Sequence, residues 1–108
     1  MNIADLQRDA HAMAIEKGWY SEGEDRCLPS LIALMHSELS EALESWREGH
    51  GASYMDGCKP EGWGVELADC IIRTADACTF YGIDLDDMLK RKMAYNATRP
   101  HRHGGKRA

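Results

Sequence analysis

The sequence predicts an all-α fold, a four-helix bundle-like protomer that is completed by oligomerisation. Four segments carry apolar residues at spacings of three and four, and glycine-containing breaks separate these segments. No stretch shows the strict alternation of a half-buried strand. The 108 residues, 44% of them apolar and 29% charged, are typical of a single globular domain, residues 1–108, with a modest core of its own. Association with further copies would bury more apolar surface.

The first expected helix runs from Ile3 to about Lys17, because this stretch is amphipathic and contains neither glycine nor proline. Asn2 is its expected N-cap, and Gly18 ends it. The second expected helix starts at residue 29 or 30, where a proline fits the first turn, and runs to residue 47 or 48. Gly49 follows and ends this helix.

Residues 50–63 contain three glycines and a proline without periodicity, so we expect a loop rather than a helix or a strand. A loop of about 14 residues is long for a compact domain and suggests a lid, an oligomer contact or a flap. The third expected helix, from near Gly64 to about Tyr81, is apolar on most sides, which is typical of a bundle centre or a subunit interface. Asp84 then caps a fourth helix that ends near Asn96 to Thr98. Residues 101–108 form a basic terminus that we expect to be flexible.

Trp19 and Tyr20 directly follow the first expected helix and precede a polar loop. An aromatic pair just beyond a helix end most often packs over the core. The alternative interpretation is that Trp19 presents its ring for a nucleobase to stack on. The residues alone leave both interpretations open.

The strongest chemical feature is a repeated acidic spacing, Glu38-x-x-Glu41 in the second expected helix and Glu66-x-x-Asp69 in the third. Positions three apart lie roughly 60° apart around a helix, so each pair projects from one side, which is otherwise apolar. A single pair of this kind is common surface decoration. If the two helices pack antiparallel, four carboxylates converge, and they stay ionised together only around a hard divalent cation. All-oxygen ligation favours Mg²⁺, with Mn²⁺ as the alternative.

A second group of polar side chains lies towards the end of the fourth expected helix. Lys92 and Asn96 are one turn apart on the same face, and Arg99 follows at the helix end. Lysine and arginine bind phosphate oxygens, and an asparagine amide can donate to a sugar or phosphate oxygen. On their own these residues also fit a solvated helix face, but the two acidic pairs favour the phosphate-binding interpretation.

Charge is distributed unevenly along the chain. Residues 1–87 contain 18 acidic and six basic residues, a net charge of −12, whereas residues 88–108 contain seven basic and no acidic residues, a net charge of +7. A basic segment folded over a metal-loaded acidic pocket would hold a polyphosphate between them. We expect no nucleic-acid partner, because the acidic part repels phosphate unless a metal intervenes. No apolar run approaches the roughly 18 residues that span a bilayer, and the N-terminus is unlike a signal peptide, so we expect a cytoplasmic protein without a membrane partner.

The segments LMHSELSEALESWR, GVELADCIIR and KMAYNATRPHRHGGKR resemble the motifs of the MazG-like family. This family belongs to the all-α nucleoside triphosphate pyrophosphohydrolases, which also include the dimeric dUTPases and the dCTP pyrophosphatases. The resemblance covers roughly residues 30 to 105, most of the chain. It implies a helical bundle completed by forming a dimer or a tetramer, Mg²⁺ bound by four carboxylates, and cleavage of nucleoside triphosphates into monophosphates and pyrophosphate.

The resemblance also implies roles for individual residues. The implied metal ligands are Glu38, Glu41, Glu66 and Asp69. The implied substrate-binding residues are Trp19, Lys92, Asn96 and Arg99. Glu41 or Glu38 would accept the proton of an attacking water, and Arg73 is placed to stabilise a ligand carboxylate. The expected function is an Mg²⁺-dependent pyrophosphohydrolase that cleanses the nucleotide pool, and the alternative is a non-catalytic helical module that senses nucleotides or metal.

Overall fold

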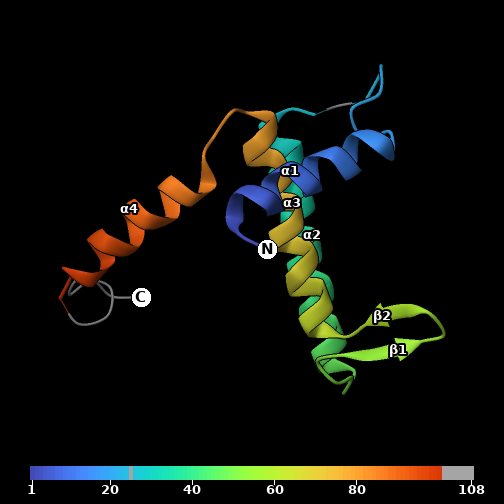
Figure 1. Ribbon diagram of the computed structural model, residues 1–108. Coiled ribbons are helices and arrows are strands. Elements are labelled where there is room, and N and C mark those ends of the chain that lie inside the picture. The colour runs from blue at the N-terminus through green and yellow to red at the C-terminus, as the bar shows by residue number, and fades with distance from the viewer. Residues whose placement is uncertain (25, 101–108) are drawn as a thin grey trace.

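The computed structural model in Figure 1 describes residues 1–24 and 26–100, so the basic terminus expected at 101–108 lies outside the described residues. Its elements are α1 (Ile3–Glu16), α2 (Leu28–Arg47), β1 (Tyr54–Asp56), β2 (Lys59–Glu61), α3 (Trp63–Phe80) and α4 (Leu85–Ala97). The prediction of a helical fold with four helices is confirmed. No helix among the described residues has the length and hydropathy needed to cross a membrane.

The helix ends follow the local chemistry of the sequence. Asn2 Oδ1 accepts a hydrogen bond from the backbone N–H of Asp5 at 2.8 Å, and Asp84 Oδ1 accepts one from Asp87 at 3.2 Å. Each bond satisfies an N–H group that has no partner within its own helix. Helix α2 carries a proline in its first turn, where the missing N–H costs no hydrogen bond. The starts of three helices were therefore predictable to within one or two residues.

The expectation of a strandless loop at residues 50–63 was wrong. Strands β1 and β2 pair antiparallel, with Tyr54 opposite Glu61 and Asp56 opposite Lys59. Each strand has three residues and almost no buried position, so no alternation of apolar and polar residues marks it. Gly57 occupies the tight turn with φ 64°, and the dipeptide Asp56-Gly57 was the available signal for a hairpin.

Helices α2 and α3 form an antiparallel pair, which runs vertically through the middle of Figure 1. Helix α1 lies across one end of this pair, the hairpin extends from the other end, and α4 projects away from the pair. The buried side chain of Gln7 connects α1 to the turn between α3 and α4. Its Nε2 donates to Ile83 O at 2.8 Å, and its Oε1 accepts from the backbone N–H of Leu85 at 3.0 Å. These two bonds fix the direction in which α4 leaves the body.

The core of one copy consists mainly of small residues. The buried apolar residues are Ala10, Leu31, Ala42, Ala75 and Ala77, and no large side chain in the described residues is fully buried. The radius of gyration is 16.3 Å, whereas a compact chain of this length has a value of about 13 Å. Helix α4 contains no buried residue. Within the described residues, the four helices thus do not close into a bundle in a single copy.

The junction between β2 and α3 is closely packed. Gly62 has φ 122°, and a Cβ added there would lie 2.5 Å from the carbonyl oxygen of Ala52. The N–H of Gly64 donates to the same oxygen at 2.9 Å. The hairpin is therefore held against the N-terminus of α3, one turn before Glu66.

Replacing Gly62 by alanine should destabilise the protein by about 1–3 kcal/mol, because the new Cβ meets a backbone atom and the φ angle suits only glycine. Urea-induced unfolding, followed by circular dichroism, measures this loss. Gly51→Ala is the matched control, since a Cβ there meets nothing within 4 Å. Equal stability of the two variants would contradict the close packing at this junction.

Candidate metal centre

Three carboxylates from two helices meet in the middle of the α2–α3 pair. Glu38 comes from α2, Glu66 and Asp69 come from α3, and one oxygen of each lies within 4.8 Å of the others. Glu38 is 7% exposed, although it is charged. The packing of α2 against α3 brings Glu38 to the same level as Glu66 and Asp69.

The fourth predicted ligand, Glu41, adjoins the same group. The pKa of Glu66 is raised to about 7, first by burial and then by hydrogen bonds to Glu38 and Glu41 and by their negative charge. Burial and the charge of Glu38 also raise the pKa of Asp69, although Arg73 opposes this shift. Burial disfavours the charged form of Glu66 and its acidic neighbours repel that charge, so Glu66 keeps its proton up to a pH of about 7.

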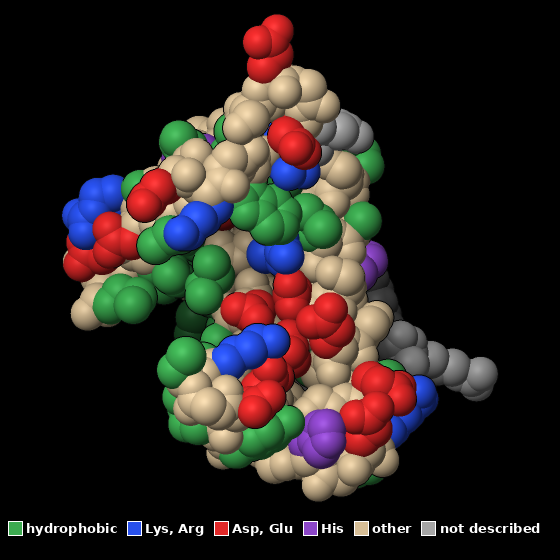
Figure 2. Space-filling view, turned by 90° about the vertical axis from the view of Figure 1, so that its right-hand side faces the viewer, with side chains coloured by type: hydrophobic (Ala, Val, Ile, Leu, Met, Phe, Trp, Pro, Cys, Tyr) green, Lys and Arg blue, Asp and Glu red, His purple; other side chains and the backbone are tan. Residues whose placement is uncertain are grey.

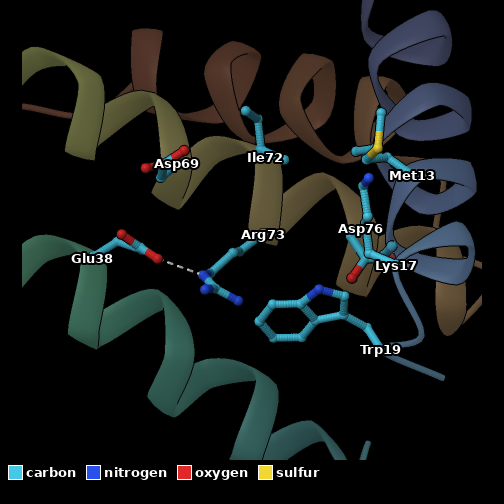
Figure 3. Close-up of a pocket in the computed structure, with 10 residues that line it drawn as sticks. Met13, Lys17, Trp19, Glu38, Asp69, Ile72, Arg73 and Asp76 are labelled. Carbon is cyan, nitrogen blue, oxygen red and sulfur yellow. Dashed lines mark hydrogen bonds and ion pairs between the residues drawn. The ribbon is translucent and has the colours of Figure 1, made fainter. Parts of the chain in front are cut away.

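Arg73 connects the carboxylates to the aromatic side chain of Trp19. Its Nε donates to Glu38 Oε1 at 2.7 Å, and its guanidinium lies 4.6 Å from the centroid of the Trp19 ring. Figure 3 shows Arg73 between Glu38 and Trp19, with Asp69 on the near side of α3. The guanidinium thus holds Glu38 in place and stacks on the indole at the same time.

A cavity of about 250 Å³ opens beside this contact. Its lining residues are Ala10, Met13, Ala14, Lys17, Trp19, Glu38, Asp69, Ile72, Arg73 and Asp76. Helix α1 and Ile72 supply an apolar wall, Trp19 supplies an aromatic one, and the carboxylates stand at one end. A cavity of this kind combines apolar surface with a few convergent polar groups, as small-molecule sites do.

A second hollow, of about 260 Å³, lies on the other side of the carboxylates, between α2 and the hairpin. It is lined by Glu41, Glu44, Ser45, Glu48, His50, Tyr54, Glu61, Gly62 and Glu66. Figure 2 shows acidic side chains gathered on this face of the molecule. Glu38 and Asp69 therefore border the first hollow, whereas Glu41 and Glu66 border the second.

The hairpin adds a cation that the sequence analysis missed. Lys59 Nζ lies 2.8 Å from Glu61 Oε1, and Glu61 lines the second hollow together with Glu66. The pKa of Lys59 is raised mainly by its hydrogen bond to Glu61 and the charge of Glu61, and to a smaller extent by the charge of Glu66. Lys59 in turn weakly opposes the rise in the pKa of Asp69, which is caused first by burial. Lys59 thus lies within electrostatic reach of the carboxylates. Its position depends on the hairpin, so no periodic signal in the sequence marks it.

Asp76 was missed as well. Its Oδ2 accepts from the Tyr20 hydroxyl at 2.8 Å, its Oδ1 lies 2.8 Å from His11 Nδ1, and Tyr20 stacks on Phe80 at a centroid distance of 4.7 Å. Burial, followed by the bond to Asp76, raises the pKa of Tyr20. This network fixes the segment that carries the neighbouring Trp19. The spacing of four and then three residues from Asp69 through Arg73 to Asp76 could have revealed it.

The structure separates Lys92, Asn96 and Arg99 from the carboxylates. Lys92 Nζ lies 5.0 Å from the ring centroid of Tyr95, and the Arg99 guanidinium lies 5.9 Å from it, so both cations pack on their own helix. None of the three lines either hollow. Figure 1 shows α4 on one side of the α2–α3 pair, and the acidic side chains in Figure 2 lie on a face turned away from that side.

Comparisons with protein-family models, with curated proteins and with solved structures found no match. The chemistry of the site therefore rests on its own residues. Three carboxylate oxygens within 4.8 Å of one another form a donor set that suits a hard dication, and a dication would offset the repulsion among these carboxylates. The adjoining aromatic and apolar cavity can accommodate a small organic group.

Without divalent metal, the free energy of unfolding should fall as the pH rises. Glu66 has a pKa of about 7 in the folded protein and an ordinary value of 4.5, so between these values the folded state binds more protons than the unfolded state. This contribution is present at low pH and is lost as the pH passes through about 7. Urea unfolding in EDTA at several pH values between about 4.5 and 8 measures it.

In Glu66→Gln the amide stays neutral, so the dependence of stability on pH should become shallower. Glu16→Gln, on the exposed surface of α1, is the control and should keep the wild-type slope. A wild-type stability that rises over this range, or that is unaffected by Glu66→Gln, would show that the carboxylates do not interact in this way.

Proposed function

We propose that this protein is an Mg²⁺-dependent nucleoside triphosphate pyrophosphohydrolase, with Mn²⁺ as an alternative metal, that removes unwanted nucleotides from the pool. The observation that carries the proposal is the convergence of Glu38, Glu66 and Asp69 from two antiparallel helices. Two further observations support it: Glu41 adjoins the group, and a cavity with an aromatic wall opens directly beside it. A structural acidic cluster would not need such a cavity.

The metal would be held by Glu38, Glu41, Glu66 and Asp69. When bound, Mg²⁺ supplies positive charge that neutralises phosphate oxygens and polarises the phosphorus centre. Arg73 has a different role, because its Nε occupies one oxygen of Glu38 and keeps that carboxylate in a fixed orientation. The carboxylate of Glu38 would then meet the metal in this fixed orientation.

The base and sugar would occupy the cavity of about 250 Å³, with Trp19 as the aromatic wall. Asp76 holds the segment around Trp19 through Tyr20, so the wall does not have to be ordered by the ligand. The triphosphate would then extend from this cavity to the carboxylates. This direction places the α-phosphate, rather than the base, next to the acidic groups.

The proposed reaction is hydrolysis at the α-phosphorus. A water oxygen bonds to this phosphorus, the bond from the α-phosphorus to the bridging oxygen breaks, and pyrophosphate leaves. The water proton passes to a carboxylate. Of the two candidates, Glu41 suits this role better, because it is exposed, whereas Glu38 is buried and held by Arg73.

The protein is further proposed to act as a homo-oligomer, a dimer or a tetramer. Helix α2 exposes large apolar side chains on one stripe, which comprises Leu28, Ile32, Leu39, Leu43 and Trp46. The spacing of these residues by three, four and seven keeps them on one side of the helix. A second copy would remove this surface from water.

A nucleotide- or metal-sensing module without catalysis is the alternative function. It would use the same cavity and carboxylates and would bind Mg²⁺ with nucleotide without forming products. Nucleic-acid binding is disfavoured, because the hollow between α2 and the hairpin is lined by five carboxylates that repel phosphate.

Turnover should depend on the carboxylates. Wild-type protein incubated with a panel of NTPs and dNTPs should release monophosphate and pyrophosphate in Mg²⁺ and nothing in EDTA. Glu38→Gln and Asp69→Asn should each lower kcat by about a hundredfold or more, because the metal loses a charged ligand. Product separation measures the rate, and far-UV circular dichroism checks that the helices remain.

Glu16→Gln is the matched control and should keep full activity. Nucleotide binding without any product across the panel, in folded wild-type protein, would replace the proposed enzyme by the sensing module. Full activity of Asp69→Asn would show that the reaction does not need the carboxylates.

Replacing Lys59 should strengthen the binding of metal and weaken the binding of nucleotide. Lys59→Ala removes a positive charge near Asp69 and Glu66, so Mg²⁺ should bind about twofold more tightly, as is typical of an exposed charge. The KM for nucleotide should rise, because a cation that can contact phosphate is lost. Titration calorimetry and steady-state kinetics measure the two effects, with Lys90→Ala as the control. Weaker binding of both would indicate a damaged hairpin instead.

A further inference from the structure

The cavity beside the metal centre has a second polar end, away from the carboxylates of that centre. Asp69 and Asp76 both line the cavity. Asp76 follows Asp69 by seven residues, so it lies about 10 Å further along the axis of α3. Figure 3 shows Asp76 and Lys17 at the end of the cavity opposite Glu38, close to the ring of Trp19. A nucleotide whose phosphates meet the carboxylates would therefore bring the far edge of its base to Asp76.

The carboxylate of Asp76 is fixed before any ligand binds. Its side chain is only 13% exposed, its Oδ2 accepts from the Tyr20 hydroxyl at 2.8 Å, and its Oδ1 lies 2.8 Å from His11 Nδ1. Each carboxylate oxygen has two lone pairs, so each can accept one further hydrogen bond. The end of the cavity thus contains two hydrogen-bond acceptors whose positions are set by the fold.

Lys17 adds a hydrogen-bond donor at the same end of the cavity. Its side chain lines the cavity, and its ammonium group forms no ion pair with a residue that the structure describes. An ammonium group donates up to three hydrogen bonds and accepts none. Lys17 is exposed and can follow a ligand, whereas the buried network holds Asp76 in place. Asp76 should therefore decide which base edge fits, and Lys17 should strengthen the binding of that edge.

Two fixed acceptors beside a mobile donor complement one edge of guanine. Its N1–H and its 2-amino group are adjacent donors, and its O6 is an acceptor next to them. Adenine, cytosine, uracil and thymine each have a single donor group on the corresponding edge, so one oxygen of Asp76 would face no donor. Proteins that bind an isolated base in a pocket combine hydrogen bonds to this edge with stacking on an aromatic ring, and Trp19 lines this cavity.

We propose that Asp76 is the residue that determines base specificity and that the site takes a guanine nucleoside triphosphate. The N1–H and the 2-amino group donate to the oxygens of Asp76, and Lys17 donates to O6. This inference rests on the proposed function for the triphosphate and its cleavage. Recognition of the base does not depend on turnover and can be measured without it.

Binding of uncleavable nucleotides tests the preference for guanine. In α,β-methylene deoxynucleoside triphosphates a CH2 group replaces the bridging oxygen, so the bond to the α-phosphorus stays intact. Titration calorimetry in Mg²⁺ should show that the guanine analogue binds about ten- to a hundredfold more tightly than the hypoxanthine analogue. Hypoxanthine lacks only the 2-amino group, so one bond to a charged acceptor is lost. The adenine analogue should bind more weakly than the guanine analogue as well.

Two variants separate base recognition by Asp76 from its contact with Tyr20. Asp76→Asn keeps an oxygen that can accept from Tyr20 but replaces the other acceptor by a donor. The preference for guanine over hypoxanthine should then fall to about threefold or less. Tyr20→Phe keeps the carboxylate but removes a bond that holds it. This variant should weaken the binding of all analogues by a similar factor and keep their order. Circular dichroism checks that both variants stay helical.

If Asp76 only supports the segment around Trp19, Asp76→Asn and Tyr20→Phe should both weaken all analogues alike, and the preference should survive in both. That result overturns the inference. Equal binding of the guanine and hypoxanthine analogues by the wild type overturns it too.

The outcomes for base specificity and for catalysis are distinct. A wild type that cleaves triphosphates without a preference for guanine overturns the inference and leaves the proposed function standing. A wild type that binds the guanine analogue selectively through Asp76, but cleaves no nucleotide in the panel, overturns the proposed enzyme and supports the inference. A folded wild type that binds none of the analogues in Mg²⁺ overturns both.

Discussion

The packing of Glu38 between α2 and α3 is the constraint on which the rest of the structure depends. A charged carboxylate that is 7% exposed requires a partner, and Arg73 provides it at 2.7 Å from the opposite helix. This bond fixes the level at which the two helices meet and thereby brings Glu66 and Asp69 to Glu38. It also turns the guanidinium onto Trp19, so the aromatic wall and the acidic centre are positioned by the same side chain.

One arginine does not neutralise this centre. Glu38 is paired, but Glu66 and Asp69 both have raised pKa values, which means that their ionised forms are disfavoured where they stand. A purely structural cluster would gain stability if these acids were replaced by neutral residues. Retaining them is physically reasonable where a cation is bound, because the repulsion that burdens the free protein becomes affinity for the ion. The apolar cavity beside the cluster adds a reason to place a nucleotide there.

The elements that were predictable from the sequence depend on local chemistry. Asn2 and Asp84 cap their helices through local bonds that do not depend on the rest of the fold. Two acidic residues three positions apart likewise lie on the same side of any helix. The hairpin was missed because its strands are short and exposed, and Lys59 was missed with it. The direction in which α4 leaves the body could not be predicted from the sequence either. It is set by Gln7, whose side chain bonds to residues more than 70 positions away, and no local pattern marks such a contact.

The same bonds explain why α4, which precedes most of the positive charge of the chain's end, does not fold back onto the acidic body in the described residues. Attraction between the acidic body and the basic end is screened over about 10 Å in salt, and it acts on a helix whose first residue is already anchored by a buried amide. Local anchoring therefore outweighs long-range attraction within the copy, and the attraction remains available between copies. If the proposed enzyme works only as the proposed homo-oligomer, its activity should depend on protein concentration. Dilution below the dissociation constant of the proposed assembly should lower the rate per chain, and a rate that stays constant on dilution to the monomer would place every catalytic group in one copy.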